Sequence, residues 1–78
     1  MLKFSGYFLF TRDRVDRKII NMEWIEQVYY HPEFEEIQED GRLRRWGYIK
    51  EINRYLRVVV LEDKVTIHNA FIDRSFKR

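Results

Sequence analysis

The chain has 78 residues, of which 45% are hydrophobic, 36% are charged and 17% are aromatic, and it contains no cysteine. We expect one small domain spanning residues 1–78, and a composition of this kind argues against both a disordered chain and a membrane protein. The lack of cysteine excludes disulfides, thiolate metal sites and cysteine nucleophiles. No apolar run exceeds four residues, so we expect neither a transmembrane helix nor a secretory signal, and a cytoplasmic location.

The formal net charge of +2 conceals a segmented pattern. Residues 21–40 contain seven acidic and no basic side chains, whereas residues 41–61 contain six basic side chains and one acidic one. A domain with two such segments can bind a polyanion with one surface and a protein with another. We therefore expect the acidic segment to lie apart from the basic one. The alternative is that both segments only form the ordinary charged outer faces of helices and strands.

The first half of the chain predicts a strand and two short helices. Residues 2–10 alternate apolar side chains around a glycine and are rich in aromatic rings, which favours a strand. Thr11 can cap a short helix after it. Asn21 can cap a second helix with an apolar stripe, and Pro32 ends that helix near Tyr30, because the residue before proline disfavours the helical conformation.

The second half predicts strands joined by tight turns, with Asp40–Gly41 as a strong hairpin signal. The predicted strands cover residues 33–38, 42–50, 54–61 and 65–73. The predicted fold class is α+β: an N-terminal strand, two short helices, then a three- or four-stranded antiparallel sheet with both helices on one face. We expect the basic tail from residue 74 to fray or to form a short last turn.

Side-chain alternation assigns the two faces of this sheet. Leu56, Val58 and Val60 form an unbroken apolar row, which we place against the helices. The other face is then open. In the last strand, the side chains that share one face are those of Thr66, His68, Ala70 and Ile72. The most economical register gathers on the open face the side chains of Arg44, Trp46, Tyr48, Arg57 and His68.

Arginines interleaved with a tryptophan and a tyrosine suit single-stranded RNA. Guanidinium groups bind phosphate, and unstacked bases lie on aromatic rings. The same side chains can instead stabilise an exposed sheet through cross-strand pairs, or form a dimer or partner interface. The pattern leaves these alternatives open.

His68 is the histidine that lies on a predicted strand, and an imidazole can move protons near neutral pH. An ordinary half-buried histidine is the alternative. His31 precedes a proline and is typical of a turn. The spacing of the two histidines is not that of metal ligands, so we predict no metal and no cofactor. The acidic residues Glu35, Glu36, Glu39 and Asp40 are typical of a solvated hairpin rim.

Two stretches of the chain, IINMEWIEQVYYHPE at 19–33 and RYLRVVVLEDKVTIHNAFIDRSFK at 54–77, resemble a bacterial family of domains of unknown function related to the RelE, ParE and BrnT toxins. The resemblance implies an α+β domain with helices packed on an antiparallel sheet. It also implies toxins that cleave mRNA without metal and that a small antitoxin neutralises. The positions that match the family pattern are Arg12, Arg57, Asp73 and Arg74.

These observations predict a toxin-like RNA-binding domain, a metal-independent endoribonuclease of a toxin–antitoxin system. The alternative is a non-catalytic interaction or dimerisation module that uses the aromatic sheet face. The expected partners are mRNA, free or on the ribosome, and a small antitoxin. A homodimer is a further option, and we expect no membrane partner. We expect Asp73 to orient Arg74 through a salt bridge. The predicted catalytic residues are His68, Arg57 and Arg74, and the predicted RNA-binding residues are Arg12, Arg44, Arg45, Trp46 and Tyr48.

Overall fold

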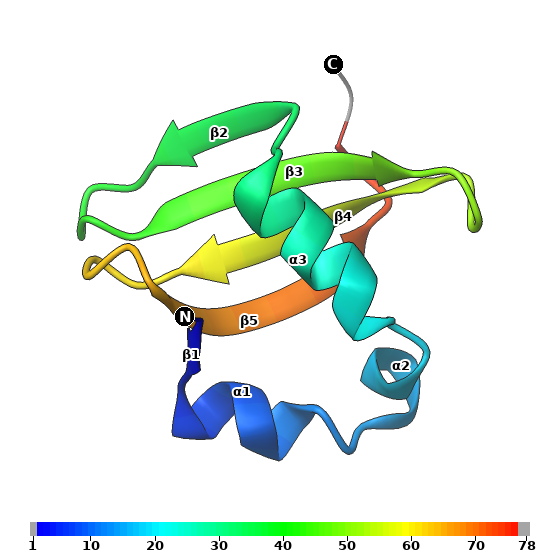
Figure 1. Cartoon of the computed structure of the whole chain (residues 1–78), viewed down its shortest axis with the longest axis horizontal. Coiled ribbons are helices and arrows are strands. Elements are labelled where there is room, and N and C mark those ends of the chain that lie inside the picture. The colour runs from blue at the N-terminus through cyan, green and yellow to red at the C-terminus, as the bar shows by residue number, and fades with distance from the viewer. Residues whose placement is uncertain (1, 77–78) are drawn as a thin grey trace.

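The chain folds into a five-stranded mixed sheet with helices on one face (Figure 1). The computed structural model describes residues 2–76. In this part of the chain the elements are β1 (Lys3–Phe4), α1 (Gly6–Thr11), α2 (Val15–Lys18), α3 (Met22–Tyr30), β2 (Phe34–Ile37), β3 (Leu43–Ile49), β4 (Arg54–Val60) and β5 (Thr66–Asp73). The strand order is β1-β5-β4-β3-β2. The predicted α+β class is confirmed. The sheet is larger than expected and is not purely antiparallel, because β1 pairs with β5 in parallel.

Tight turns make β2 to β5 antiparallel neighbours, as the sequence predicts. Gly41 has φ +89° in the first turn, a left-handed conformation that glycine adopts without steric cost. Asp40 stabilises the same turn by accepting the backbone N–H of Arg42 at 3.0 Å. In the last turn, Asp63 accepts the N–H groups of Val65 and Thr66, both at 2.9 Å.

The N-terminal segment differs from the predicted strand over residues 2–10. Only Lys3 and Phe4 of this segment form a strand, and a helix begins at Gly6. The Ser5 hydroxyl caps this helix by accepting the N–H of Phe8 at 3.0 Å. Phe8 is buried in the core, where its ring stacks on Phe4 with 5.1 Å between ring centroids. The helix forms because the cap and one buried aromatic ring outweigh the strand preference of the neighbouring aromatic residues. The predicted helix after Thr11 is reduced to the single turn α2.

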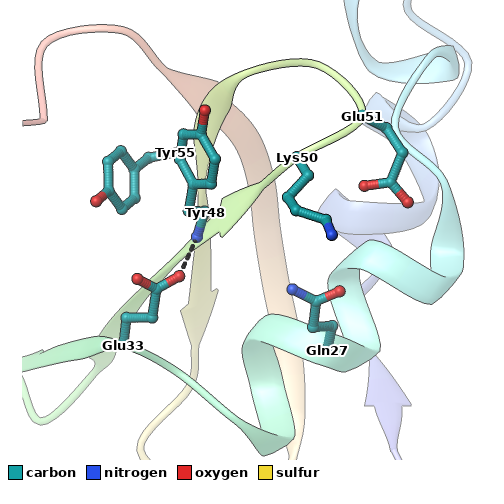
Figure 2. Close-up of a pocket in the computed structure, with 6 residues that line it drawn as sticks. All are labelled: Gln27, Glu33, Tyr48, Lys50, Glu51 and Tyr55. Carbon is teal, nitrogen blue, oxygen red and sulfur yellow. Dashed lines mark hydrogen bonds between the residues drawn. The ribbon is translucent and has the colours of Figure 1, made fainter.

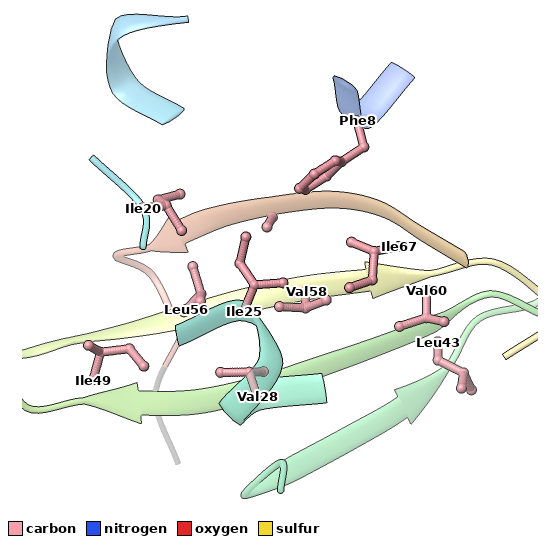
Figure 3. Packing of buried hydrophobic residues seen from close by; sticks show 11 residues of the cluster. Phe8, Ile20, Ile25, Val28, Leu43, Ile49, Leu56, Val58, Val60 and Ile67 are labelled. Atoms are coloured by element: carbon pink, nitrogen blue, oxygen red, sulfur yellow. The ribbon is translucent and has the colours of Figure 1, made fainter. Parts of the chain in front are cut away.

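Helix α3 is the element predicted most accurately. The Asn21 side chain caps it by accepting the N–H of Glu23 at 2.8 Å, and the helix ends at Tyr30, two residues before Pro32. It lies across β3 and β4 (Figure 1). Its fully buried residues Ile25 and Val28 pack among the buried residues of the sheet (Figure 3), and these are Leu43, Ile49, Leu56, Val58, Val60, Ile67 and Ala70. The predicted core row Leu56, Val58 and Val60 is confirmed.

Strand β5 contains one residue more than its partner β4, and this corrects the predicted face assignment. Val59 pairs with Asn69, but Val60 pairs with Ile67, so His68 is the extra residue of a β-bulge. Beyond the bulge the alternation is reversed. Ala70 pairs with Val58 and Ile72 pairs with Leu56 on the core face. The open face receives Asn69, Phe71 and Asp73, so the prediction that Ala70 and Ile72 share a face with His68 is wrong.

Within the described part of the chain, no helix is long and apolar enough to cross a membrane.

The close approach of α3 to the sheet depends on Gly47 in β3. A Cβ atom at this position would lie 2.8 Å from Cγ2 of Val28, which is closer than real carbon contacts allow. We predict that Gly47→Ala lowers the free energy of unfolding by about 1–3 kcal/mol, because the helix must move away from a filled core. The measurement is denaturant unfolding of the variant and the wild type.

Gly6→Ala is the matched control for this substitution. A Cβ atom at Gly6 meets nothing within 4 Å, and the position is helical and exposed. We expect this variant to be as stable as the wild type or more stable by about 0.5–1 kcal/mol. An equal loss of stability in both variants would contradict the role assigned to Gly47.

Candidate functional site

A basic groove lies on the open face of the sheet, where β3, β4 and β5 present side chains next to one another. Its volume is about 320 Å³. Three arginines and one histidine line it together with polar and apolar side chains, and none of the described lining residues is a carboxylate. We call it the basic groove. Its lining residues are Tyr7, Gln38, Arg42, Arg44, Arg57, Val59, His68, Asn69 and Phe71.

Arg57 is the most enclosed cation of the groove. Its guanidinium lies over the ring of Phe71, with 4.4 Å from Cζ to the ring centroid, and its Nε lies 3.5 Å from Oδ2 of Asp73. Within residues 2–76, this buried Nε makes no hydrogen bond. Burial lowers the pKa of Arg57 below its ordinary value, the charge of Asp73 opposes this, and the charge of Arg44 adds to it. Arg57 is therefore a poorly solvated cation that can gain from an anion in the groove.

Asp73 fixes this part of the open face. Its Oδ2 accepts the indole N–H of Trp46 at 3.0 Å, and its Oδ1 accepts the hydroxyl of Ser75 at 2.9 Å. Burial would raise the pKa of Asp73, but the hydrogen bonds from Trp46 and Ser75 and the charge of Arg57 outweigh it and lower the pKa below 3.8. The salt bridge of Asp73 is with Arg57, not with Arg74 as predicted.

His68 lies at the rim of the groove because the bulge in β5 places it there. Its Nδ1 lies 3.0 Å from the hydroxyl oxygen of Ser5, and its ring stacks on Tyr7 with 4.9 Å between centroids. Burial, and to a smaller extent the charge of Arg42, lower the pKa of His68 below 6.5. The lowered pKa favours the neutral imidazole, which is the form that can accept a proton.

The acidic and basic segments are not separated, so that prediction is wrong. Strand β2 pairs with β3 in a register that sets Glu36 opposite Arg44 and Glu35 opposite Arg45. Glu36 forms a salt bridge with Arg44 at 3.2 Å, and Glu35 forms one with Arg45. Opposite charges on paired strands attract, which explains why these segments are neighbours.

The arginines at the groove rim nevertheless stay accessible. The side chains of Arg42 and Arg44 are 39% and 36% exposed, and each has one carboxylate partner, Asp40 and Glu36 respectively. Exposed ion pairs contribute only about 0–1 kcal/mol and are screened by salt. A polyanion that offers several phosphates can therefore compete with them.

Three of the predicted site arginines lie outside the basic groove. Arg45 projects from the helix face of β3, donates to the carbonyl of Tyr29 at 2.7 Å and so satisfies the C-terminal end of α3. Arg12 donates to the carbonyl of Ile20 at 2.9 Å, next to α1. Arg74 lines a different, smaller hollow of about 190 Å³ with Arg17, Ile19, Phe71 and Ile72.

The two rings predicted to stack on bases, those of Trp46 and Tyr48, do not line the basic groove. Trp46 is on the open face but is only 5% exposed, because Phe76 stacks on it with 4.7 Å between centroids and 15° between ring planes. Phe34 and Tyr55 complete this cluster around Phe76. The C-terminal turn thus forms at residues 74–75 and returns Phe76 to the sheet; Lys77 and Arg78 lie outside the described residues.

Tyr48 belongs to a second hollow, of about 600 Å³, at the other end of β3 (Figure 2). Its ring lies edge-on to Tyr55, its backbone N–H donates to Glu33 at 2.6 Å, and its hydroxyl bonds to Asn53. Gln27 of α3 and Lys50 face each other across this hollow (Figure 2). Glu33 and Glu51 line it with only one cation, so it suits a polyanion less well than the basic groove.

Sequence reasoning predicted Arg44, Arg57 and His68 in one site, and the structure brings these three together. It missed Ser5, Tyr7, Asn69 and Phe71, since the bulge and the helix α1 that place them leave no clear local signal. In the part of the chain that is described, no three His, Asp or Glu side chains gather closely enough to hold a metal ion. No family model, curated protein or solved structure matches the chain.

The charged state of Asp73 holds the open face together, which gives a pH-dependent prediction. A carboxyl with a lowered pKa in the folded state stabilises the fold above its unfolded pKa near 4, and this contribution is lost as the pH falls through the folded pKa. We expect Asp73→Asn to lower the free energy of unfolding by about 1.5–3 kcal/mol at pH 7, because hydrogen bonds to a charged group are lost.

The difference between Asp73→Asn and the wild type should shrink towards pH 3, as measured by thermal unfolding across that range. Asp40→Asn is the control, since Asp40 forms an exposed pair worth about 0–1 kcal/mol. A pH-independent difference for Asp73→Asn would contradict the assignment.

Proposed function

We propose that the chain binds single-stranded RNA in the basic groove and cleaves it without a metal ion, as the toxin of a toxin–antitoxin pair. The observation that carries this proposal is the convergence of Arg42, Arg44, Arg57 and His68 on one groove whose described lining residues include no carboxylate. The resemblance to the RelE, ParE and BrnT toxins supports it from the sequence.

The groove offers both kinds of contact that single-stranded RNA requires. Guanidinium groups donate paired hydrogen bonds to phosphate oxygens, and three of them along one groove suit successive phosphates. Tyr7 is 47% exposed at the rim, so its free surface can stack on an unpaired base. Trp46 does not serve this purpose while Phe76 covers it.

The proposed reaction uses the nucleophile that RNA itself carries. The 2′-oxygen attacks the adjacent phosphorus as the bond from phosphorus to the 5′-oxygen breaks, which leaves a 2′,3′-cyclic phosphate and a 5′-hydroxyl. His68 accepts the proton of the 2′-hydroxyl, and water in the open groove supplies the proton to the leaving oxygen. Arg57 stabilises the charge that develops on the phosphate oxygens, an effect worth typically about 10²–10³ in rate for one well-placed donor.

The proposed partners follow from the same surface. An antitoxin that covers the groove would prevent RNA from binding there. An acidic segment of the antitoxin would complement the arginines of the groove. We propose a cytoplasmic location, where mRNA is found, since a chain without cysteine forms no disulfides and needs no oxidising compartment.

A second candidate function is a non-catalytic interaction module. Strand β2 is an edge strand, and Phe34 and Ile37 on it are 49% and 70% exposed. An edge strand with exposed apolar side chains can pair with a strand of another protein through backbone hydrogen bonds. Because backbone hydrogen bonds and the contacts of Phe34 and Ile37 would supply the affinity, it would depend less on salt than RNA binding does.

RNA binding by the groove predicts a specific salt dependence. For a short fluorescent oligouridylate, log Kd should rise linearly with log salt concentration. Arg42→Ala with Arg44→Ala should weaken binding and reduce that slope by about 1.4, since each lost contact to a single strand contributes about 0.7. Lys50→Ala with Arg54→Ala removes two exposed cations outside the groove and is the matched control. Equal effects of both pairs would favour non-specific attraction, and no binding by the wild type would favour the interaction module.

Toxicity tests the cleavage step. Expression of the wild type should arrest bacterial growth, and the purified protein should cut oligouridylate in the presence of a chelator. Arg57→Ala should relieve the arrest and lower the cleavage rate by about 10², whereas Arg54→Ala, on the same strand but outside the groove, should do neither. Because Arg57 also pairs with Asp73, each variant must show cooperative thermal unfolding. A wild type that neither slows growth nor cuts RNA would overturn the proposal.

A further inference from the structure

The contact between Ser5 and His68 joins residues 63 positions apart in the chain, next to the basic groove. Two independent features fix its geometry. The backbone N–H of Ser5 donates to the carbonyl of Ile67 at 3.0 Å, so Ser5 is attached to the strand residue that directly precedes His68. The bulge then adds His68 as the extra residue of β5, and Tyr7 stacks on its ring. The imidazole is therefore held on its Nδ1 edge and on one face.

The Ser5 hydroxyl oxygen already accepts one hydrogen bond, and it has the capacity to accept a second one from the imidazole. As the cap of α1, this oxygen accepts the N–H of Phe8 at 3.0 Å. It has a second lone pair, and Nδ1 of His68 lies 3.0 Å away. A neutral imidazole carries one proton, and the partner of one ring nitrogen decides which nitrogen holds it. A proton on Nδ1 leaves the lone pair on Nε2.

We infer that Ser5 is a positioning residue that accepts Nδ1–H of His68, so that Nε2 carries the lone pair that removes the proton from the RNA 2′-hydroxyl. This inference rests on the proposed function for its catalytic consequence, but the tautomer itself can be measured without RNA. The charged groups that share the groove with His68 are Arg42, Arg44 and Arg57, and Tyr7 is the titratable group that α1 packs against it. Burial, and to a smaller extent the charge of Arg42, lower the pKa of the ring and so favour the neutral form that a base requires.

Substitutions at Ser5 can separate this role from helix capping. Ser5→Gly removes the hydroxyl with little loss of helix stability, because glycine is tolerated at this cap position. Ser5→Thr retains the hydroxyl and should behave as the wild type. Asn21→Ala is the matched control for the loss of a helix cap. The Asn21 side chain caps α3 by accepting the N–H of Glu23 and makes no hydrogen bond to His68.

The decisive measurement is the ¹⁵N chemical shift of both ring nitrogens of His68 in the full chain at pH 8, where the ring is neutral. We expect Nδ1–H in the wild type, in Ser5→Thr and in Asn21→Ala, and a shift of population to Nε2–H in Ser5→Gly. A wild type with Nε2–H would overturn the inference, because Ser5 would then be the donor. An unchanged tautomer in Ser5→Gly would also overturn it.

The effect of Ser5 on catalysis is measured as kcat and KM for the cleavage of oligouridylate. Ser5→Gly should lower kcat at least about 10-fold with little change in KM, since a positioned general base contributes about 10²–10⁴ and its geometry is lost only in part. Ser5→Thr should restore kcat. A wild type that shows Nδ1–H but does not cleave RNA would refute the proposed function and leave the tautomer assignment standing. Normal cleavage by Ser5→Gly would refute the positioning role.

Discussion

The single extra residue in β5 is the constraint on which the rest of the site depends. Without the bulge at His68, strand alternation would turn either Ile67 or the pair Ala70 and Ile72 away from the core. With it, apolar residues on both sides of the bulge face the helices. The bulge also gives His68 a position outside the regular alternation, at the rim of the basic groove and within hydrogen-bond distance of Ser5. One local irregularity thus completes the core and places the histidine at the rim of the basic groove.

The open face has two parts that differ in accessibility. Around Phe76 the aromatic rings pack on one another, and Trp46 is buried there with its N–H bonded to Asp73. This cluster acts as a second small core, which suits a domain of a size that can bury only about 60% of its surface in total. Next to it, the arginines of the basic groove remain partly exposed. Asp73 joins both parts, because it receives the indole of Trp46 and the charge of Arg57.

The neighbouring acidic and basic strands moderate the field of the groove. The pair between Glu36 of β2 and Arg44 of β3 reduces the attraction of the groove for anions compared with three unpaired arginines. It also orients the guanidinium group of Arg44, so that an incoming phosphate meets a side chain that is already ordered. Under the proposed function, such a surface would favour a ligand with several phosphates over a single small anion, because only the former replaces several weak pairs at once.

The sequence by itself determined the elements whose signals are local. The cap at Asn21, the stop at Pro32, the Asp40–Gly41 turn and the apolar row on β4 each act within a few residues, and all are found in the structure. Tertiary structure alone decided the helix after Ser5, the bulge at His68 and the pairing of Asp73 with Arg57. These features depend on which distant residues meet: Phe8 leaves the strand pattern because the core accepts its ring, and β5 shifts register because both of its halves bury apolar side chains against the same helices. Contacts between residues tens of positions apart carry that energy, and no short sequence pattern encodes them.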